Sequence, residues 1–117
     1  MRHHRKGRAF ARVAKGKTAL MRSLACSLIS KEKIVTTEAK ARELRPYIEK
    51  LVTKCRKDTI ANRRIVGARL GNAVRATSKL FAEISPRYLE RAGGYTRITK
   101  LPPRKSDSSK QAMIEFV

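Results

Sequence analysis

The sequence of 117 residues has no tryptophan, only two cysteines, and nine acidic residues against 29 lysines and arginines. Cys26 and Cys55 are too few and too far apart for the paired thiolates of a zinc site, so we expect two reduced thiols and no bound metal. Aromatic residues make up 5% of the chain, too few for the base-stacking platform of an RNA-recognition motif. These shortages argue against a zinc domain and against sequence readout of single strands.

Long apolar runs are also missing. Without a run of about 18 apolar residues, the sequence predicts no membrane-spanning segment. The basic start continues into Gly7, Arg8 and Arg12 rather than into an apolar stretch, so we expect no secretory signal. A mitochondrial presequence would share the arginine content but would bring more serine and an amphipathic face. The expected location is the cytoplasm, without membrane contact.

Groups suited to catalysis are scarce. His3 and His4 are the only imidazoles, and they lie in a segment that nothing in the sequence holds rigid, whereas acid-base catalysis needs a positioned group. Gly93-Gly94 lacks the wider Gly-Lys-Ser/Thr pattern of a phosphate loop. We therefore predict no enzyme, no cofactor and no small-molecule substrate, and we expect His3 and His4 to stack on bases or bind phosphate.

Positive charge is what the chain has in excess, because its net charge is +20. The first acidic residue is Glu32, so the cations before it cannot be neutralised within their own segment. Solubility needs far less charge, whereas a polyphosphate backbone binds cations through counterion release without a shaped pocket. Nucleic acid is the expected partner, with contacts from Arg2, Arg5, Lys6, Arg8, Arg12, Lys15, Lys17 and Arg22.

Helical periodicity follows this N-terminal segment. Thr18 is expected to cap a first helix, with Cys26 opposite its apolar face. Thr37 is expected to cap a second helix, kinked at Pro46 but continuous. Its apolar stripe should face the core and consists of Ala41, Leu44, Ile48, Leu51, Val52 and Cys55.

Two more helices and three strands are predicted beyond residue 57. Asp58 should cap a third helix, and Ser85-Pro86 should stop a fourth, whose apolar residues fall within 73–84. β-branched and aromatic residues predict strands at 95–101 and 111–117. A sheet of two strands alone is only marginally stable, so we expect the segment 34–37 to pair with them. The prediction is an α+β fold: about four helices packed on a small three-stranded sheet, with a basic RNA-binding extension at residues 1–17 and one domain at residues 18–117.

Three strings in the sequence resemble a known family. They are MRHHRKGR at residues 1–8, LRPYIEKL at residues 44–51 and RAGGYTRI at residues 91–98. Together and in this order they closely resemble bacterial large-subunit ribosomal protein seventeen, from one end of the chain to the other. One departure is the loop 105–110, which lacks the glycine that the family has between its last two strands.

The resemblance implies a role in the large ribosomal subunit. It implies an α+β domain that binds large-subunit ribosomal RNA beside neighbouring ribosomal proteins, without catalytic activity. Carried onto this sequence, it implies RNA contacts from Arg63, Arg64, Arg91 and Arg97 in addition to the N-terminal cations. Tyr95 is expected to pack rather than to bind. The alternative that composition alone allows is a DNA-binding or nucleoid-type protein, which would need a recognition helix or a symmetric dimer.

Overall fold

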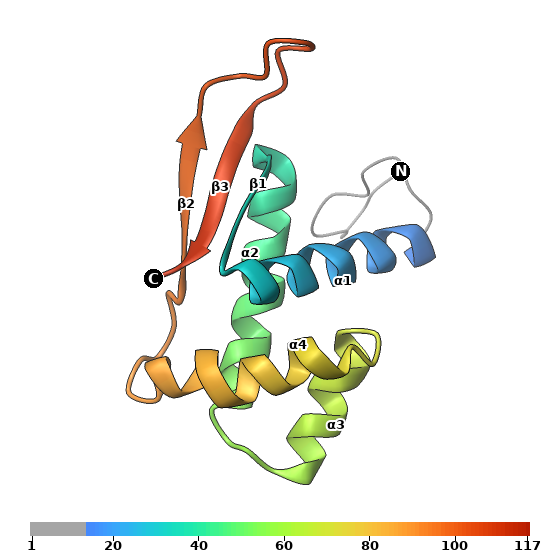
Figure 1. Cartoon of the computed structure of the whole chain (residues 1–117), viewed down its shortest axis with the longest axis vertical. Helices are drawn as coiled ribbons and strands as arrows, with labels where there is room; N and C mark the ends of the chain where they lie inside the picture. Colours follow the sequence, from blue (N-terminus) through green and yellow to red (C-terminus); the bar gives the residue numbers. More distant parts are fainter. Residues whose placement is uncertain (1–13) are drawn as a thin grey trace, which may run out of the picture.

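The computed structural model describes residues 14–117, and residues 1–13 lie outside the described part. Four helices pack with a three-stranded antiparallel sheet (Figure 1), so the predicted α+β class is confirmed. Among residues 14–117, no helix combines the length and the apolar character needed to cross a membrane. The elements in chain order are α1 (Ala14–Lys31), β1 (Lys33–Thr37), α2 (Glu38–Cys55), α3 (Ile60–Arg69), α4 (Val74–Lys79), η1 (Leu80–Ile84), η2 (Ser85–Tyr88), β2 (Thr96–Leu101) and β3 (Gln111–Phe116).

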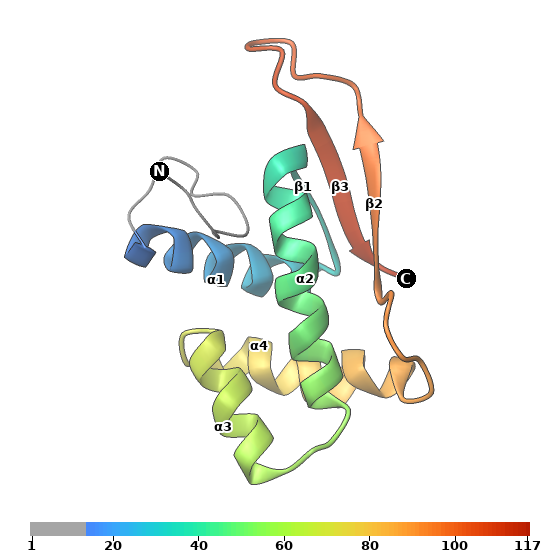
Figure 2. The ribbon, with the colours of Figure 1, turned by 180° about the vertical axis from the view of Figure 1, so that it is seen from behind.

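Helix α2 is the element around which the others pack, and Figure 2 shows it crossing the molecule from the sheet to α3. The predicted cap is confirmed, because the Thr37 hydroxyl oxygen accepts a hydrogen bond from the Lys40 amide at 3.3 Å. Pro46 lies inside the helix on its exposed side, and the helix continues through it as predicted. All six residues of the predicted apolar stripe are buried: Ala41, Leu44, Ile48, Leu51, Val52 and Cys55.

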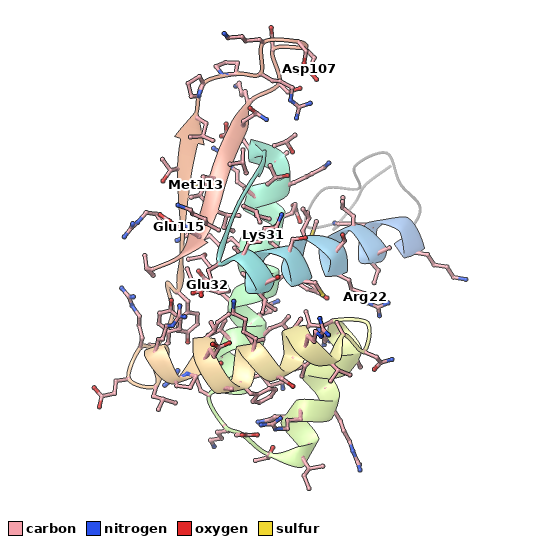
Figure 3. All side chains as sticks on the ribbon, in the orientation of Figure 1. Arg22, Lys31, Glu32, Asp107, Met113 and Glu115 are labelled. Atoms are coloured by element: carbon pink, nitrogen blue, oxygen red, sulfur yellow. The ribbon has the colours of Figure 1, made fainter. Side chains whose placement is uncertain are left out.

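The sheet has the strand order β1-β3-β2, so the segment 33–37 pairs with the C-terminal strand as expected. Ile114 of β3 lies opposite Ile34 on one side and Ile98 on the other. Side chains alternate along a strand, so these isoleucines share the face that packs on α2, while Met113 and Glu115 lie on the opposite face (Figure 3). The sheet thus contributes one apolar face to the core.

The first helix does not begin where we expected. Thr18 lies inside α1, and its hydroxyl donates to the Ala14 carbonyl oxygen at 3.0 Å, so it is not the N-cap. Residues 14–17, which we assigned to the extension, belong to α1. A hydroxyl that bonds back to the carbonyl four residues earlier is compatible with a helix interior, which is why Thr18 alone could not mark the start.

The predicted cap of α3 is also wrong by one residue. The Thr59 hydroxyl oxygen accepts from the Asn62 amide at 3.1 Å and caps the helix. Asp58 instead accepts two hydrogen bonds from Arg63, at 2.6 and 2.8 Å. Two adjacent residues could both cap, and the Arg63 side chain decides between them because it engages the carboxylate.

Pro86 does not end the helical path, contrary to our expectation. After α4 the chain forms the π-helical segment η1 and then the 3₁₀ turn η2, which extends to Tyr88. Pro86 stands at the start of this turn, where a missing amide proton is tolerated. This continuation of the helical path buries Tyr88, whose ring centre lies 5.2 Å from the ring centre of Tyr95.

The two cysteines differ in their surroundings. Cys55 packs in the core as predicted, and burial raises the pKa of its thiol to about 12. Cys26 is not on the open side of α1 as we expected, because it is half-buried against the core with its sulfur 3.8 Å from the Leu70 carbonyl oxygen. Burial raises the pKa of this thiol as well. Both side chains therefore act as packing groups.

The loop between β2 and β3 closes without glycine. Ser108 adopts a positive φ of 59°, and its amide donates to the Arg104 carbonyl oxygen at 2.8 Å. The Asp107 carboxylate accepts from the Ser109 amide at 3.1 Å and from Arg104 at 3.2 Å. An aspartate side chain that bonds the backbone two residues on stabilises such a turn. These hydrogen bonds close a turn that contains no glycine.

Candidate nucleic-acid interface

Most acidic residues are already paired with basic residues of the same chain. All nine carboxylates lie within residues 14–117. Glu83 and Glu90 are exposed and form no ion pair in this part of the chain. The other seven each have a lysine or arginine nitrogen within 4.0 Å: Glu32, Glu38, Glu43, Glu49, Asp58, Asp107 and Glu115. The exposed charge that remains is therefore mostly positive.

Exposed cations without such a pair are spread over several elements of the described part of the chain rather than gathered in one pocket. Among residues 14–117 no three His, Cys, Asp or Glu side chains are placed to hold a metal ion. Positive charge spread over several elements suits the backbone of a folded RNA better than a small ligand. The exposed cations without an ion pair in residues 14–117 are Lys15, Arg22, Lys31, Lys33, Lys50, Lys54, Lys57, Arg64, Arg69, Arg75, Arg91, Lys105 and Lys110.

The cations expected at the N-terminus fall into two groups. Lys15 is exposed on α1, and Lys17 lies 3.9 Å from Glu43 of α2. The RNA contacts expected from residues 1–13 lie outside the described residues, and they concern Arg2, His3, His4, Arg5, Lys6, Arg8 and Arg12.

Arg22 reaches from α1 to the end of α3, as Figure 3 shows. It donates to the Ala68 carbonyl oxygen at 3.4 Å. A Cβ added at Gly71, whose φ is +68°, would lie 3.3 Å from the Arg22 Cδ atom. The positive φ favours glycine in the turn after α3, and the Arg22 side chain packs close beside it. This side chain joins two helices and still presents its exposed charge.

The neighbours Arg63 and Arg64 differ in what they offer. Arg63 is bound to both oxygens of Asp58, and its guanidinium lies 4.8 Å from the centre of the Phe81 ring. Its hydrogen bond lowers the pKa of the Asp58 carboxyl. Arg64 is exposed and unpaired within residues 14–117. Of the two, Arg64 is the one whose charge is available to a partner.

Arg91 and Arg97 flank the Gly93-Gly94 turn. Arg97 is 61% exposed, although it lies 3.4 Å from the Glu115 carboxylate on the next strand. The Arg91 carbonyl oxygen accepts a hydrogen bond from the Tyr95 hydroxyl at 3.2 Å. The Arg91 side chain itself is exposed. Tyr95 is fully buried, so it packs as expected.

A group of cations that the sequence did not suggest surrounds a groove on the outer side of α2. Lys50 and Lys54 come from α2 and Arg69 from the end of α3. The groove has a volume of about 590 Å³. The only local signal is the spacing of four between the lysines, opposite the apolar stripe, which is also what a solvated helix face shows.

The chain is similar in sequence to known ribosomal proteins. The family model described as Ribosomal protein L17 matches residues 20–117. The large ribosomal subunit protein bL17 of Persephonella marina is 50% identical over 118 residues, which cover 100% of this chain and 95% of that protein. The bL17 proteins of Hydrogenobaculum sp. and Thermomicrobium roseum are 51% and 46% identical, and each alignment covers 100% of this chain and 99% of the relative. The chain therefore belongs to the ribosomal protein L17 family.

Proposed function

We propose that this protein is a structural constituent of the large ribosomal subunit in the cytoplasm, where it binds and stabilises folded large-subunit ribosomal RNA. Residues 1–17 form its basic RNA-binding segment, whose last four residues are the start of α1. Further contacts come from exposed cations of the domain at residues 18–117, including Arg22, Arg64, Arg91 and Arg97. Neighbouring large-subunit ribosomal proteins are the other partners, and the proposal involves no catalysis, membrane or small-molecule substrate.

The observation that carries this proposal is that most carboxylates are paired within the protein whereas many exposed cations are not. Seven of the nine carboxylates are held by lysine or arginine, while exposed cations without an ion pair in residues 14–117 lie on α1, β1, α2, α3 and α4 and in the loops. Each cation that replaces a condensed counterion on RNA gains binding free energy. A protein that binds RNA on several sides at once holds RNA segments together, which is how it stabilises the folded subunit.

Salt dependence of binding tests the role of the extension. Affinity for a large-subunit RNA transcript is measured by filter binding over a range of salt concentrations. Five cations lie in residues 1–13, and their replacement by glutamine should reduce the log-log slope by about 4. The matched control is His3→Gln with His4→Gln, which changes the same segment without changing its formal charge and should leave the slope unchanged.

Two results would count against the proposal. Equal slopes for the wild type and the variant with five glutamines would mean that the extension is not the main electrostatic contact. A DNA duplex that competes as well as ribosomal RNA would favour the nucleoid-type alternative. Co-sedimentation with large subunits after a high-salt wash is the independent check.

A further inference from the structure

The outer side of α2 carries a groove that the proposed RNA contacts leave unused. In Figure 2 this side of α2 faces the viewer, with α3 on one side and the chain leading to β2 on the other. The groove is lined by Pro46 of α2, Ile65 of α3 and the segment 92–93. Its volume of about 590 Å³ is within the range of pockets that hold small organic groups.

The lining of the groove is apolar. Ile65 is 40% exposed and Pro46 is exposed, while Leu51 and Tyr95 lie buried beneath them. A single exposed isoleucine on a helix normally needs no explanation. Here Ile65 lines a hollow together with a proline ring, so a flat apolar group that enters it would be covered on more than one side.

The rim of the groove is positive. Lys50, Lys54 and Arg69 are exposed and form no ion pair within residues 14–117. The one carboxylate in the lining is Glu49, which already accepts from the Thr96 hydroxyl at 2.8 Å and the Thr96 amide at 3.3 Å. Glu49 is therefore held by the fold, and the charge free to meet a ligand is cationic.

The backbone at one end of the rim is also fixed. The Tyr47 hydroxyl donates a hydrogen bond to the Arg69 carbonyl oxygen, which joins α2 to the last residue of α3. Arg69 is thus held beside the groove while its guanidinium stays exposed. A planar guanidinium can stack on a base as well as bind a phosphate.

We propose that this groove holds one unpaired nucleotide of the folded RNA, with its base against Pro46 and Ile65 and its phosphate beside the lysines and Arg69. The inference rests on the proposed function, because it names how that RNA is gripped at one place. An unstacked base has an apolar face and an anionic backbone, which matches an apolar floor with a cationic rim. An apolar side chain from a protein would desolvate these three cations without pairing them.

The test uses two isoleucines of α3 in the full-length protein. Ile65 lines the groove, whereas Ile60 is 72% exposed and outside it. Ile65→Ser should weaken binding to a large-subunit RNA transcript by about fivefold or more at fixed salt, because it removes an apolar contact with the base. Ile60→Ser should leave affinity unchanged, and neither substitution changes charge, so both should keep the wild-type salt slope. Melting curves of the two variants show whether the fold is retained.

A second measurement uses the wild-type protein alone, so it does not depend on the variants' folding. RNA carrying 4-thiouridine is cross-linked by light in the complex, and the linked peptides are identified by mass spectrometry. Peptides that include Pro46, Lys50 or Ile65 are expected. Cross-links that all lie elsewhere in the chain would overturn the inference.

The outcomes separate this inference from the proposed function. If the wild type does not bind the RNA at all, the proposed function fails and the groove inference fails with it. If the wild type binds and Ile65→Ser binds equally well, only the groove inference fails. If Ile65→Ser binds free RNA normally but is lost from large subunits in a salt wash, the groove holds a neighbouring protein, which also overturns the inference.

Discussion

Replacing Ile114 by alanine should destabilise the protein strongly. Ile114 is fully buried at the centre of the sheet, between Ile34 and Ile98, on the face that packs on α2. Removing a buried isoleucine costs about 2 to 5 kcal/mol, and the upper part of this range applies where neighbours cannot close the cavity. Strands on both sides and a helix beneath restrict such closure, so we expect about 4 kcal/mol. For a domain of this size the melting temperature should fall by about 12 to 20 °C.

The matched control is Val35→Ala in the neighbouring strand. Val35 is also branched and aliphatic, but it is 56% exposed on the opposite face of the sheet. Its loss should cost less than about 1 kcal/mol, mainly through strand propensity. Urea unfolding followed by circular dichroism gives both free energies. Equal losses for the two variants would refute the assignment of the sheet faces.

Three further predictions concern stability and reactivity. Tyr95→Phe should cost about 1 to 3 kcal/mol in urea unfolding, because the buried hydroxyl also lies 3.0 Å from the Thr53 hydroxyl; an unchanged midpoint would contradict this. Thr59→Ala should cost about 1 kcal/mol by removing the cap of α3, and an unchanged unfolding midpoint would contradict this assignment. Iodoacetamide should label Cys26 well before Cys55 in the native protein, because Cys55 is buried with a pKa of about 12; equal rates in mass spectrometry would show that the core opens readily.

Much of the fold could be predicted from periodicity because its signals are local. The six apolar residues of α2 share one face whatever surrounds them, so their burial followed from spacing alone. The strand 33–37 was recognisable by its β-branched residues, and the need for a third strand gave its pairing. The prediction of a capping residue was wrong where two neighbouring residues could both cap, as with Asp58 and Thr59. The choice between them depends on which carboxylate the Arg63 side chain binds.

The candidate site was less predictable because charge alone does not show which cations are already paired. Arg63 and Arg64 are neighbours in the sequence, yet only the structure shows that Arg63 is held by Asp58. The groove was missed for a related reason. Lys50 and Arg69 are 19 residues apart, and they meet only because α3 folds back along the outer side of α2. No local pattern encodes that approach.

The ion pairs of Glu32 should make stability depend on acid in a defined direction. Glu32 directly follows α1 (Figure 3) and has a φ of 65°. Its carboxylate binds Arg87, and the Lys79 nitrogen lies 3.7 Å away. The hydrogen bond from Arg87 lowers the pKa of the Glu32 carboxyl below 4.5. A lowered pKa in the folded state means that the stabilisation is fully present above the unfolded value and is lost as the pH falls through the folded value.

Glu32→Gln should therefore lower the melting temperature at neutral pH, and its difference from the wild type should shrink as the pH falls below 4.5. Because the carboxylate is partly exposed and screened, the effect at neutral pH should be less than about 1 kcal/mol. Glu83→Gln is the matched control, since Glu83 forms no ion pair among residues 14–117. Melting curves recorded across acid pH test the sign as well as the size. A difference that grows toward acid would mean that the pair with Arg87 does not form in solution.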